Sequence, residues 1–131
     1  MNQSISFMIE GVPVSKGRPK FARRGKFITA YTPSKTRAAG DDFISKARKF
    51  APENPFEGSV SLKIVFVMPI PKSVKKAPVF HTKRPDLDNL LKLAEDSMNG
   101  IFYKDDSQIA DIHARKVYGN RPMTVVCIEK V

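Results

Sequence analysis

The chain has 131 residues, 41% of them hydrophobic, and a formal net charge of +10 at pH 7. This length and composition predict one globular domain, residues 1–131, and argue against a disordered chain. The sequence has no apolar run of the roughly 18 residues that span a membrane, and no signal-peptide pattern at its start. With a single cysteine, Cys127, that cannot form an internal disulfide, we expect a cytoplasmic protein without membrane association.

The first half of the chain predicts two strands and a helix. Residues 4–10 alternate apolar and polar side chains, which is typical of a strand with one buried face. A loop follows and turns at Arg24-Gly25 into a short strand at residues 27–31. Thr32-Pro33 is a helix-start signal, and the helix is expected to run to about Phe50.

The second half predicts a strand, a helix and two more strands. Residues 60–67 are the clearest strand, and their apolar character indicates a central place in the sheet. Residues 70–84 form a long loop rich in proline and lysine. Helical spacing of apolar residues marks residues 87–98, and alternation marks a strand at 108–118 that turns into a C-terminal hairpin with 123–128. Together the elements predict an α/β or α+β fold, a mixed β-sheet with about two helices.

The positive charge is concentrated in two runs that contain no acidic residue. Residues 11–40 contain eight Lys and Arg residues, and residues 58–85 contain six. Such runs are typical of surfaces that bind the phosphates of nucleic acid, and the alternative is a solvated surface that maintains solubility. The candidate nucleic-acid-binding residues are Lys16, Arg18, Lys20, Arg23, Arg24, Lys72, Lys75, Lys76, Lys83 and Arg84.

The negative charge is concentrated as well, because seven of the thirteen Asp and Glu residues lie within residues 86–111. An acidic cluster in a basic protein repels a polyanion unless a cation lies between them. Carboxylate oxygens are the ligands that Mg²⁺ and Mn²⁺ prefer, and such ions bind substrate phosphates directly. This arrangement predicts a metal-dependent nuclease.

Within this cluster, Asp86 and Asp88 lie where the long loop meets the predicted helix. Two residues apart in extended chain, their side chains point to the same side, and the free N–H groups of a helix start favour negative charge. Asp106 comes near them only if the helix is short and the next connection runs back along it. Lys92, one turn after Asp88, is placed to stabilise charge on a phosphoryl group.

Each of these residues has a plainer interpretation. Asp88 is equally a candidate for a helix N-cap, and Asp105 or Asp106 for a cap or turn. Lys92 is a candidate for a surface pair with a carboxylate one turn away on the helix, at Asp88 or Asp96. The spacing alone leaves these alternatives open.

At these residues the sequence resembles the RusA family of Holliday junction resolvases, found in bacteria and their phages. The family pattern is a basic residue, Pro-Asp-x-Asp-Asn, a lysine and an aspartate on the following helix, an Asp-Asp pair and a glutamine. The matching residues are Arg84, Pro85, Asp86, Asp88, Asn89, Lys92, Asp96, Asp105, Asp106 and Gln108, with Lys116 in the next strand. Lys16-Gly17-Arg18-Pro19 and Tyr31-Thr32-Pro33 resemble weaker early motifs of the family.

The resemblance implies that Asp86, Asp88 and Asp106 coordinate Mg²⁺ or Mn²⁺ and that Lys92 is a catalytic lysine. It also implies a homodimer that nicks two opposed strands of four-way junction DNA, since a two-fold dimer presents equivalent sites to a junction of similar symmetry. We therefore expect a metal-dependent endodeoxyribonuclease of DNA recombination and repair. The alternatives are a branched-DNA-binding module without cleavage and a metal-dependent hydrolase of a small phosphorylated substrate.

Overall fold

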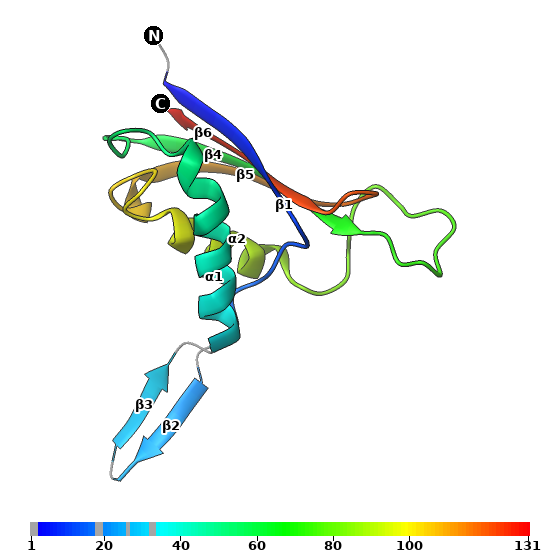
Figure 1. Cartoon of the computed structure of the whole chain (residues 1–131), viewed down its shortest axis with the longest axis horizontal. Coiled ribbons are helices and arrows are strands. Elements are labelled where there is room, and N and C mark those ends of the chain that lie inside the picture. Colours follow the sequence, from blue (N-terminus) through cyan, green and yellow to red (C-terminus); the bar gives the residue numbers. More distant parts are fainter. Residues whose placement is uncertain (1–2, 18–19, 26, 32–33) are drawn as a thin grey trace.

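A four-stranded mixed sheet forms the body of the protein (Figure 1). The computed structural model describes residues 3–17, 20–25, 27–31 and 34–131. The sheet has the order β1-β6-β4-β5, in which β6 is antiparallel to both its neighbours and β4 is parallel to β5. Its strands are β1 (Ser4–Glu10), β4 (Val60–Pro69), β5 (Ile109–Gly119) and β6 (Met123–Lys130). The predicted mixed sheet is confirmed.

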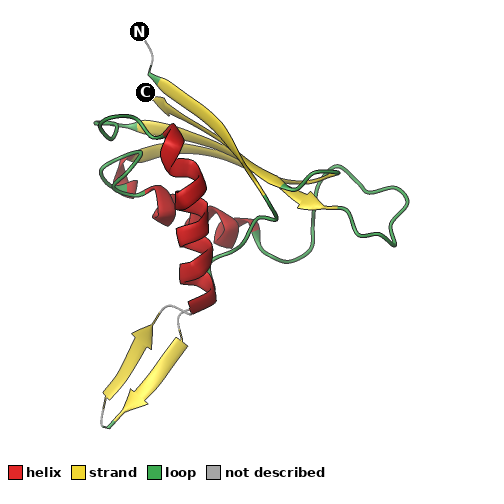
Figure 2. Ribbon diagram, in the orientation of Figure 1, coloured by secondary structure: helices red, strands yellow, loops and turns green. Residues whose placement is uncertain are grey.

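The main helices both lie on one face of this sheet (Figure 2). They are α1 (Ser34–Ala47), which continues into a short 3₁₀ turn, η1 (Arg48–Phe50), and α2 (Leu87–Met98). A second 3₁₀ turn, η2 (Asp106–Gln108), precedes β5. The fold is therefore α+β with the two helices that the sequence predicts, and none of the described helices is long and apolar enough to cross a membrane.

The core lies between the sheet and the helices. On β4, alternate side chains from Leu62 to Phe66 are at most 2% exposed, and they meet Leu90 and Met98 of α2, both fully buried. Burial of each large apolar side chain contributes about 1.5–3 kcal/mol, so this contact fixes α2 against the centre of the sheet. The predicted central position of β4 and the predicted buried face of α2 are confirmed.

The predicted C-terminal hairpin is wrong. β5 and β6 follow one another in the chain, but β4 lies between them and pairs with both. Neighbouring strands lie about 4.8 Å apart, so residues 120–122 need to span only about 10 Å to cross the end of one strand, which three extended residues can do. The strongly apolar β4 thus takes the position that is protected on both edges.

A separate two-stranded hairpin precedes α1. It consists of β2 (Lys20–Arg24) and β3 (Phe27–Tyr31), joined through Gly25 at φ +63°. The predicted turn and the strand at 27–31 are confirmed, whereas the sequence had predicted a loop where β2 lies. The helix-start signal Thr32-Pro33 falls outside the described residues, and α1 begins directly after it at Ser34.

The long loop between β4 and α2 returns along the free edge of β5 before the helix begins. Phe80 forms an antiparallel bridge with Val117, and the Tyr118 N–H donates to the Val79 carbonyl at 3.0 Å. These bonds satisfy backbone groups that an edge strand leaves unpaired. They bring the end of the loop, and with it the start of α2, to the edge of the sheet.

Candidate active site

The start of α2 presents a carboxylate that the helix itself does not use. Asp86 is the N-cap residue, with extended backbone at φ −69° and ψ 144°, yet its side chain makes no capping hydrogen bond. Asp88 lies inside the first turn, so the interpretation of Asp88 as the N-cap does not apply. Both side chains are exposed. Their charges are therefore available to a ligand at a helix end that favours negative charge.

An open cavity of about 380 Å³ lies directly at this helix start. Its lining joins a cation, Arg84, to a carboxylate, Asp86, with Asn89 and Ser15 beside them. Arginine binds phosphate oxygens through a fork of N–H donors, and carboxylate and amide oxygens suit a hard cation. The cavity thus offers groups for both parts of a phosphate bound through a metal.

The segment before β2 packs against α2 through Lys16. The Lys16 N–H donates to the Asn89 carbonyl at 3.0 Å, and the Lys16 Nζ pairs with an oxygen of Asp96 at 2.8 Å. Lys16 was predicted to bind DNA, and in the free protein its ammonium already neutralises Asp96. Its role in DNA binding stays a prediction.

Lys92 lies exposed on α2 and, among the residues that the structure describes, forms no salt bridge. Its interpretation as half of a surface ion pair with Asp88 or Asp96 is therefore not what the structure shows. By helical spacing it shares a face with Asp88 and Glu95. An ammonium that forms no salt bridge and lies on the same exposed helix face as a carboxylate is suited to bind a phosphate.

Asp105 is a structural cap. Its side chain accepts from the Ser107 N–H at 3.2 Å, and the Gln108 side chain accepts from the Asp105 N–H at 2.9 Å, which completes a capping box for η2. Gln108 also donates to the carbonyls of Phe56 and Gly58, both at 2.8 Å. The hydrogen bonds from Ser107 lower the pKa of Asp105. Of the interpretations open to Asp105, capping is the one that these contacts support.

Asp106 lies beside the second half of α2. Burial raises the pKa of Glu95 and of Tyr103 most, and the charge of Asp106 raises both further. The Tyr103 hydroxyl donates to the Glu95 carbonyl at 2.6 Å. The connection after α2 folds back onto the last turn of the helix, where Tyr103 contacts Glu95. Within the described part of the chain, however, no three acidic, histidine or cysteine side chains converge as a metal-binding group. The assignment of Asp106 as a metal ligand with Asp86 and Asp88 stays a prediction.

Glu95 is a further carboxylate of this region, and the sequence alone assigned no role to it. Burial raises its pKa most, the charges of Asp106 and Asp96 raise it further, and Lys92 lowers it. The sequence contains a signal for it, because Glu95 follows Asp88 by seven positions and Lys92 by three, which places all three on one helix face. Negative charge thus extends along α2 beyond its first turn.

We expect Glu95→Gln to raise the free energy of unfolding at pH 7. Because the pKa of Glu95 is raised in the folded protein from its ordinary 4.5, wild-type stability falls as the pH rises from about 4.5 through the folded pKa. The advantage of the glutamine variant should therefore shrink toward pH 4. Urea unfolding at both pH values measures it, with the exposed Glu53→Gln as control. A variant less stable than wild type at pH 7 would contradict this account.

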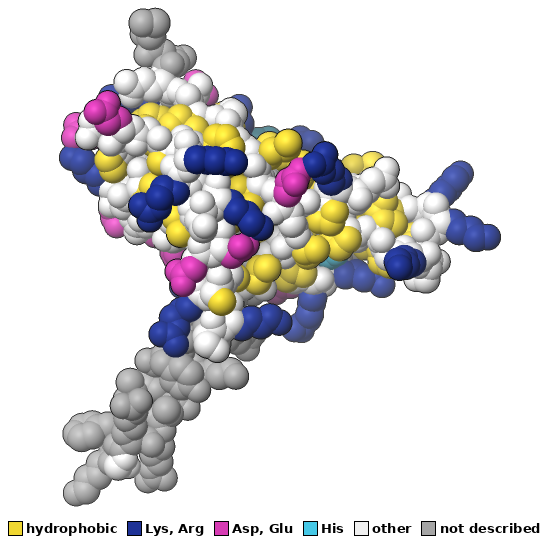
Figure 3. All heavy atoms as spheres, viewed as in Figure 1, with side chains coloured by type: hydrophobic (Ala, Val, Ile, Leu, Met, Phe, Trp, Pro, Cys, Tyr) yellow, Lys and Arg dark blue, Asp and Glu magenta, His cyan; other side chains and the backbone are white. Residues whose placement is uncertain are grey.

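The structure describes the side chains of some of the predicted DNA-binding residues but not of others. In the loop at residues 70–85, all five of them are exposed, and Lys and Arg side chains stand out at that end of the molecule (Figure 3). These are Lys72, Lys75, Lys76, Lys83 and Arg84. Arg18 lies outside the described residues, as do the side chains of Lys20, Arg23 and Arg24 on β2. For β2 only the backbone position is established.

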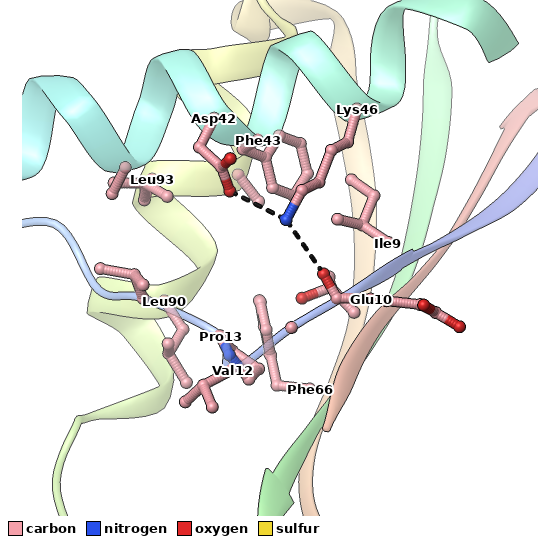
Figure 4. A pocket seen from close by; sticks show the side chains of 15 residues that line it. Ile9, Glu10, Val12, Pro13, Asp42, Phe43, Lys46, Phe66, Leu90 and Leu93 are labelled. Carbon is pink, nitrogen blue, oxygen red and sulfur yellow. Dashed lines mark hydrogen bonds and ion pairs between the residues drawn. The ribbon is translucent and has the colours of Figure 1, made fainter. Parts of the chain in front are cut away.

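A second cavity, of about 160 Å³, lies between α1, α2 and β1 (Figure 4). Its lining combines large apolar residues such as Phe43, Phe66 and Leu90 with polar groups. At its edge the Lys46 Nζ is already engaged by Asp42 at 3.1 Å and by the Glu10 carbonyl at 3.3 Å. With its polar groups paired to one another, this space is a gap in packing rather than a reaction site.

The start of α2 thus combines carboxylates, an arginine and a lysine that forms no salt bridge with any described residue, on a basic α+β domain, and these groups are suited to a phosphate ligand. Comparison with known proteins agrees. The family model described as Endodeoxyribonuclease RusA matches residues 10–129. The chain therefore belongs to the RusA family of endodeoxyribonucleases.

Two relatives match the chain, and the name of the second agrees with this family. The uncharacterized protein YqaN of Bacillus subtilis (strain 168) is 32% identical over 137 residues, which cover 97% of this chain and 96% of that protein. The crossover junction endodeoxyribonuclease rusA of Lactococcus phage r1t is 43% identical over 72 residues, which cover 53% of this chain and 54% of that protein. The likeness to YqaN extends over nearly the whole of both chains.

Proposed function

We propose that this protein is a divalent-metal-dependent endodeoxyribonuclease that resolves four-way DNA junctions in recombination and repair. The observation that carries the proposal is the start of α2, where Asp86 holds the N-cap position without capping and shares a cavity with Arg84. Membership of the RusA family of endodeoxyribonucleases supports cleavage of DNA as the reaction. A relative named as a crossover junction endodeoxyribonuclease supports a DNA junction as the substrate.

The residues at α2 fit Mg²⁺ or Mn²⁺. Mg²⁺ is commonly bound through one or two carboxylates together with waters and substrate phosphate, and Asp86 and Asp88 supply two such groups. Asp106 is the proposed third ligand. The ion, when bound, activates a water molecule and neutralises charge on the phosphoryl oxygens.

The other residues of the site have distinct proposed roles. Arg84 holds a phosphate oxygen of the DNA backbone in the cavity that it shares with Asp86. Lys92 stabilises the negative charge that develops on the phosphoryl group during cleavage. Lys92 forms no salt bridge among the described residues, so no carboxylate holds its ammonium in place.

The loop at residues 70–85 is proposed to bind the DNA backbone, so replacing Lys72, Lys75 and Lys76 with Gln should weaken junction binding. Removal of one lysine that neutralises a phosphate lowers the slope of log K against log salt by about 0.9 in magnitude. A gel-shift titration at several salt concentrations measures both the affinity and the slope. Lys49, Lys104 and Lys130, changed together to Gln, remove the same charge elsewhere. If both triple variants bind alike, the loop has no special role in DNA binding.

We further propose a homodimer in solution. Resolution of a junction requires two opposed cuts, and a two-fold dimer supplies two equivalent sites to a substrate of the same approximate symmetry. Sedimentation equilibrium should give about twice the chain mass of 14.7 kDa. A strict monomer that still makes paired cuts would contradict this part of the proposal.

The central test is a cleavage assay on a synthetic four-way junction and on linear duplex of the same sequence, with and without Mg²⁺. We expect metal-dependent, paired nicks in the junction and little cutting of the duplex. Junction binding without cutting in Mg²⁺ or Mn²⁺ would favour the branched-DNA-binding module. Hydrolysis of small phosphate esters without junction binding would favour the small-substrate hydrolase.

A further inference from the structure

Lys116, on the edge strand β5, holds the end of the loop that leads into α2. Its Nζ donates to the Lys83 carbonyl at 2.6 Å and to the Pro85 carbonyl at 2.7 Å. Its own carbonyl accepts from the His81 N–H at 2.9 Å. One strand residue thus contacts three of the last six residues before α2.

The register of the sheet explains how this side chain reaches the loop. Lys116 lies beside Phe66 of β4, whose side chain is buried beneath the helices. Neighbouring residues of paired strands point to the same face, so the lysine side chain leaves the sheet on the face where α2 begins. It is partly buried there.

The charge of Lys116 is balanced by carbonyl oxygens. Within the described part of the chain it forms no salt bridge, and its ammonium donates to the two carbonyls named above. A partly buried ammonium is costly unless its donors are used, and hydrogen bonds from a charged donor are stronger than neutral ones. The lysine and the two carbonyls therefore hold one another in place.

The residues at the two carbonyls bracket the reactive groups of the site. Lys83 and Pro85 flank Arg84, and Asp86 follows at once; Arg84 and Asp86 both line the cavity at α2. Residues 82–86 belong to no helix or strand, so the regular hydrogen bonds of such elements do not fix them. The direction of the Arg84 and Asp86 side chains then depends on where Lys116 holds the backbone.

We propose that Lys116 is a positioning residue: through the Lys83 and Pro85 carbonyls it orients Arg84 and Asp86 toward a shared phosphate and divalent cation. This inference rests on the function proposed above. Lys116 acts on the backbone and does not touch the DNA. Loss of its side chain should therefore change how the site binds the ion more than how the protein binds the junction.

Lys116→Met removes the charge and donors while keeping the length of the side chain, and Lys116→Arg keeps a charge and several donors. For the methionine variant we expect about a tenfold or greater rise in the Mg²⁺ concentration for half-maximal junction cutting, the range found when groups that orient metal ligands are removed. High Mg²⁺ should restore part of the rate. The arginine variant should lie between methionine and wild type. Lys130→Met, a strand lysine at the opposite end of the sheet, is the matched control.

Two further measurements separate positioning from other roles. Hydrogen exchange without metal or DNA should show faster exchange for the amides of residues 82–87 in Lys116→Met, while the sheet amides stay as in wild type. Junction binding in Ca²⁺, measured across salt, should keep the wild-type slope. A slope lower by about one would instead make Lys116 a phosphate contact and overturn the proposal.

The outcomes distinguish this inference from the proposed function. If wild type cuts junctions and Lys116→Met cuts with unchanged Mg²⁺ dependence, the positioning role is wrong and the nuclease proposal stands. If wild type does not cut junctions at all, the nuclease proposal fails, and unchanged exchange at residues 82–87 would then reject the structural half of this inference too. Should Lys116→Met not fold, Lys116→Arg carries the same comparisons.

Discussion

Asp86→Asn and Asp88→Asn are each expected to lower the rate of junction cutting by about a hundredfold or more, while the protein still folds and binds DNA. Asparagine keeps the shape of aspartate but removes the charge that a divalent ion requires of its ligands. Junction binding should persist or tighten, because less negative charge then faces the phosphates. Single-turnover cutting in Mg²⁺ and gel-shift binding in Ca²⁺ measure the two effects separately.

Asp86→Asn should change the charge of the site without lowering the stability of the protein. The carboxylate of Asp86 makes no capping hydrogen bond, and asparagine is itself a favoured N-cap residue, so thermal stability should not fall. Asp42→Asn on α1, which removes an exposed carboxylate paired with Lys46, is the control for loss of charge alone. Asp106→Asn should also lose cutting if Asp106 is the third ligand. Wild-type cutting by Asp86→Asn would reject the metal-site assignment.

The elements that present the proposed site residues could be predicted where they are encoded by local sequence. Asp86 and Asp88 are two positions apart in the chain, and the apolar spacing from Leu87 to Met98 defines the helix that presents them. For Asp105 the local spacing left a cap or turn open as one alternative, which the capping box of η2 supports. Signals within one turn of helix or one turn of chain are readable because geometry at that range follows from the backbone alone.

Contacts between distant segments were not predictable in the same way. Lys116 bonds to Lys83 across 33 positions, and Lys16 pairs with Asp96 across 80. The first depends on strand order and register, and the second on how the segment before β2 packs against α2; no local pattern encodes either. The error over the C-terminal hairpin has the same origin, since consecutive strands usually pair but here β4 separates them. The strand β2 was missed because three of its five residues, Lys20–Arg24, are charged, which hides the alternation of a strand.

Lys92→Met is expected to reduce junction cutting by about a hundredfold or more, while binding of the divalent ion stays as in wild type. Removal of one group that stabilises charge in a transition state costs about 10²–10³ in rate. Lys92 lies one turn after Asp88 and forms no salt bridge within the described residues. We therefore propose that its ammonium acts on the phosphoryl group.

The Mg²⁺ dependence separates this lysine from the other residues of the site. Lys92→Met should lower the maximal rate and leave the half-maximal Mg²⁺ concentration unchanged, whereas Lys116→Met should raise that concentration and respond to added metal. Lys92→Arg should rescue poorly, because a planar guanidinium does not replace a compact ammonium at a fixed position. If high Mg²⁺ restores cutting by Lys92→Met, Lys92 acts on the metal site and its assignment to the phosphoryl group is wrong.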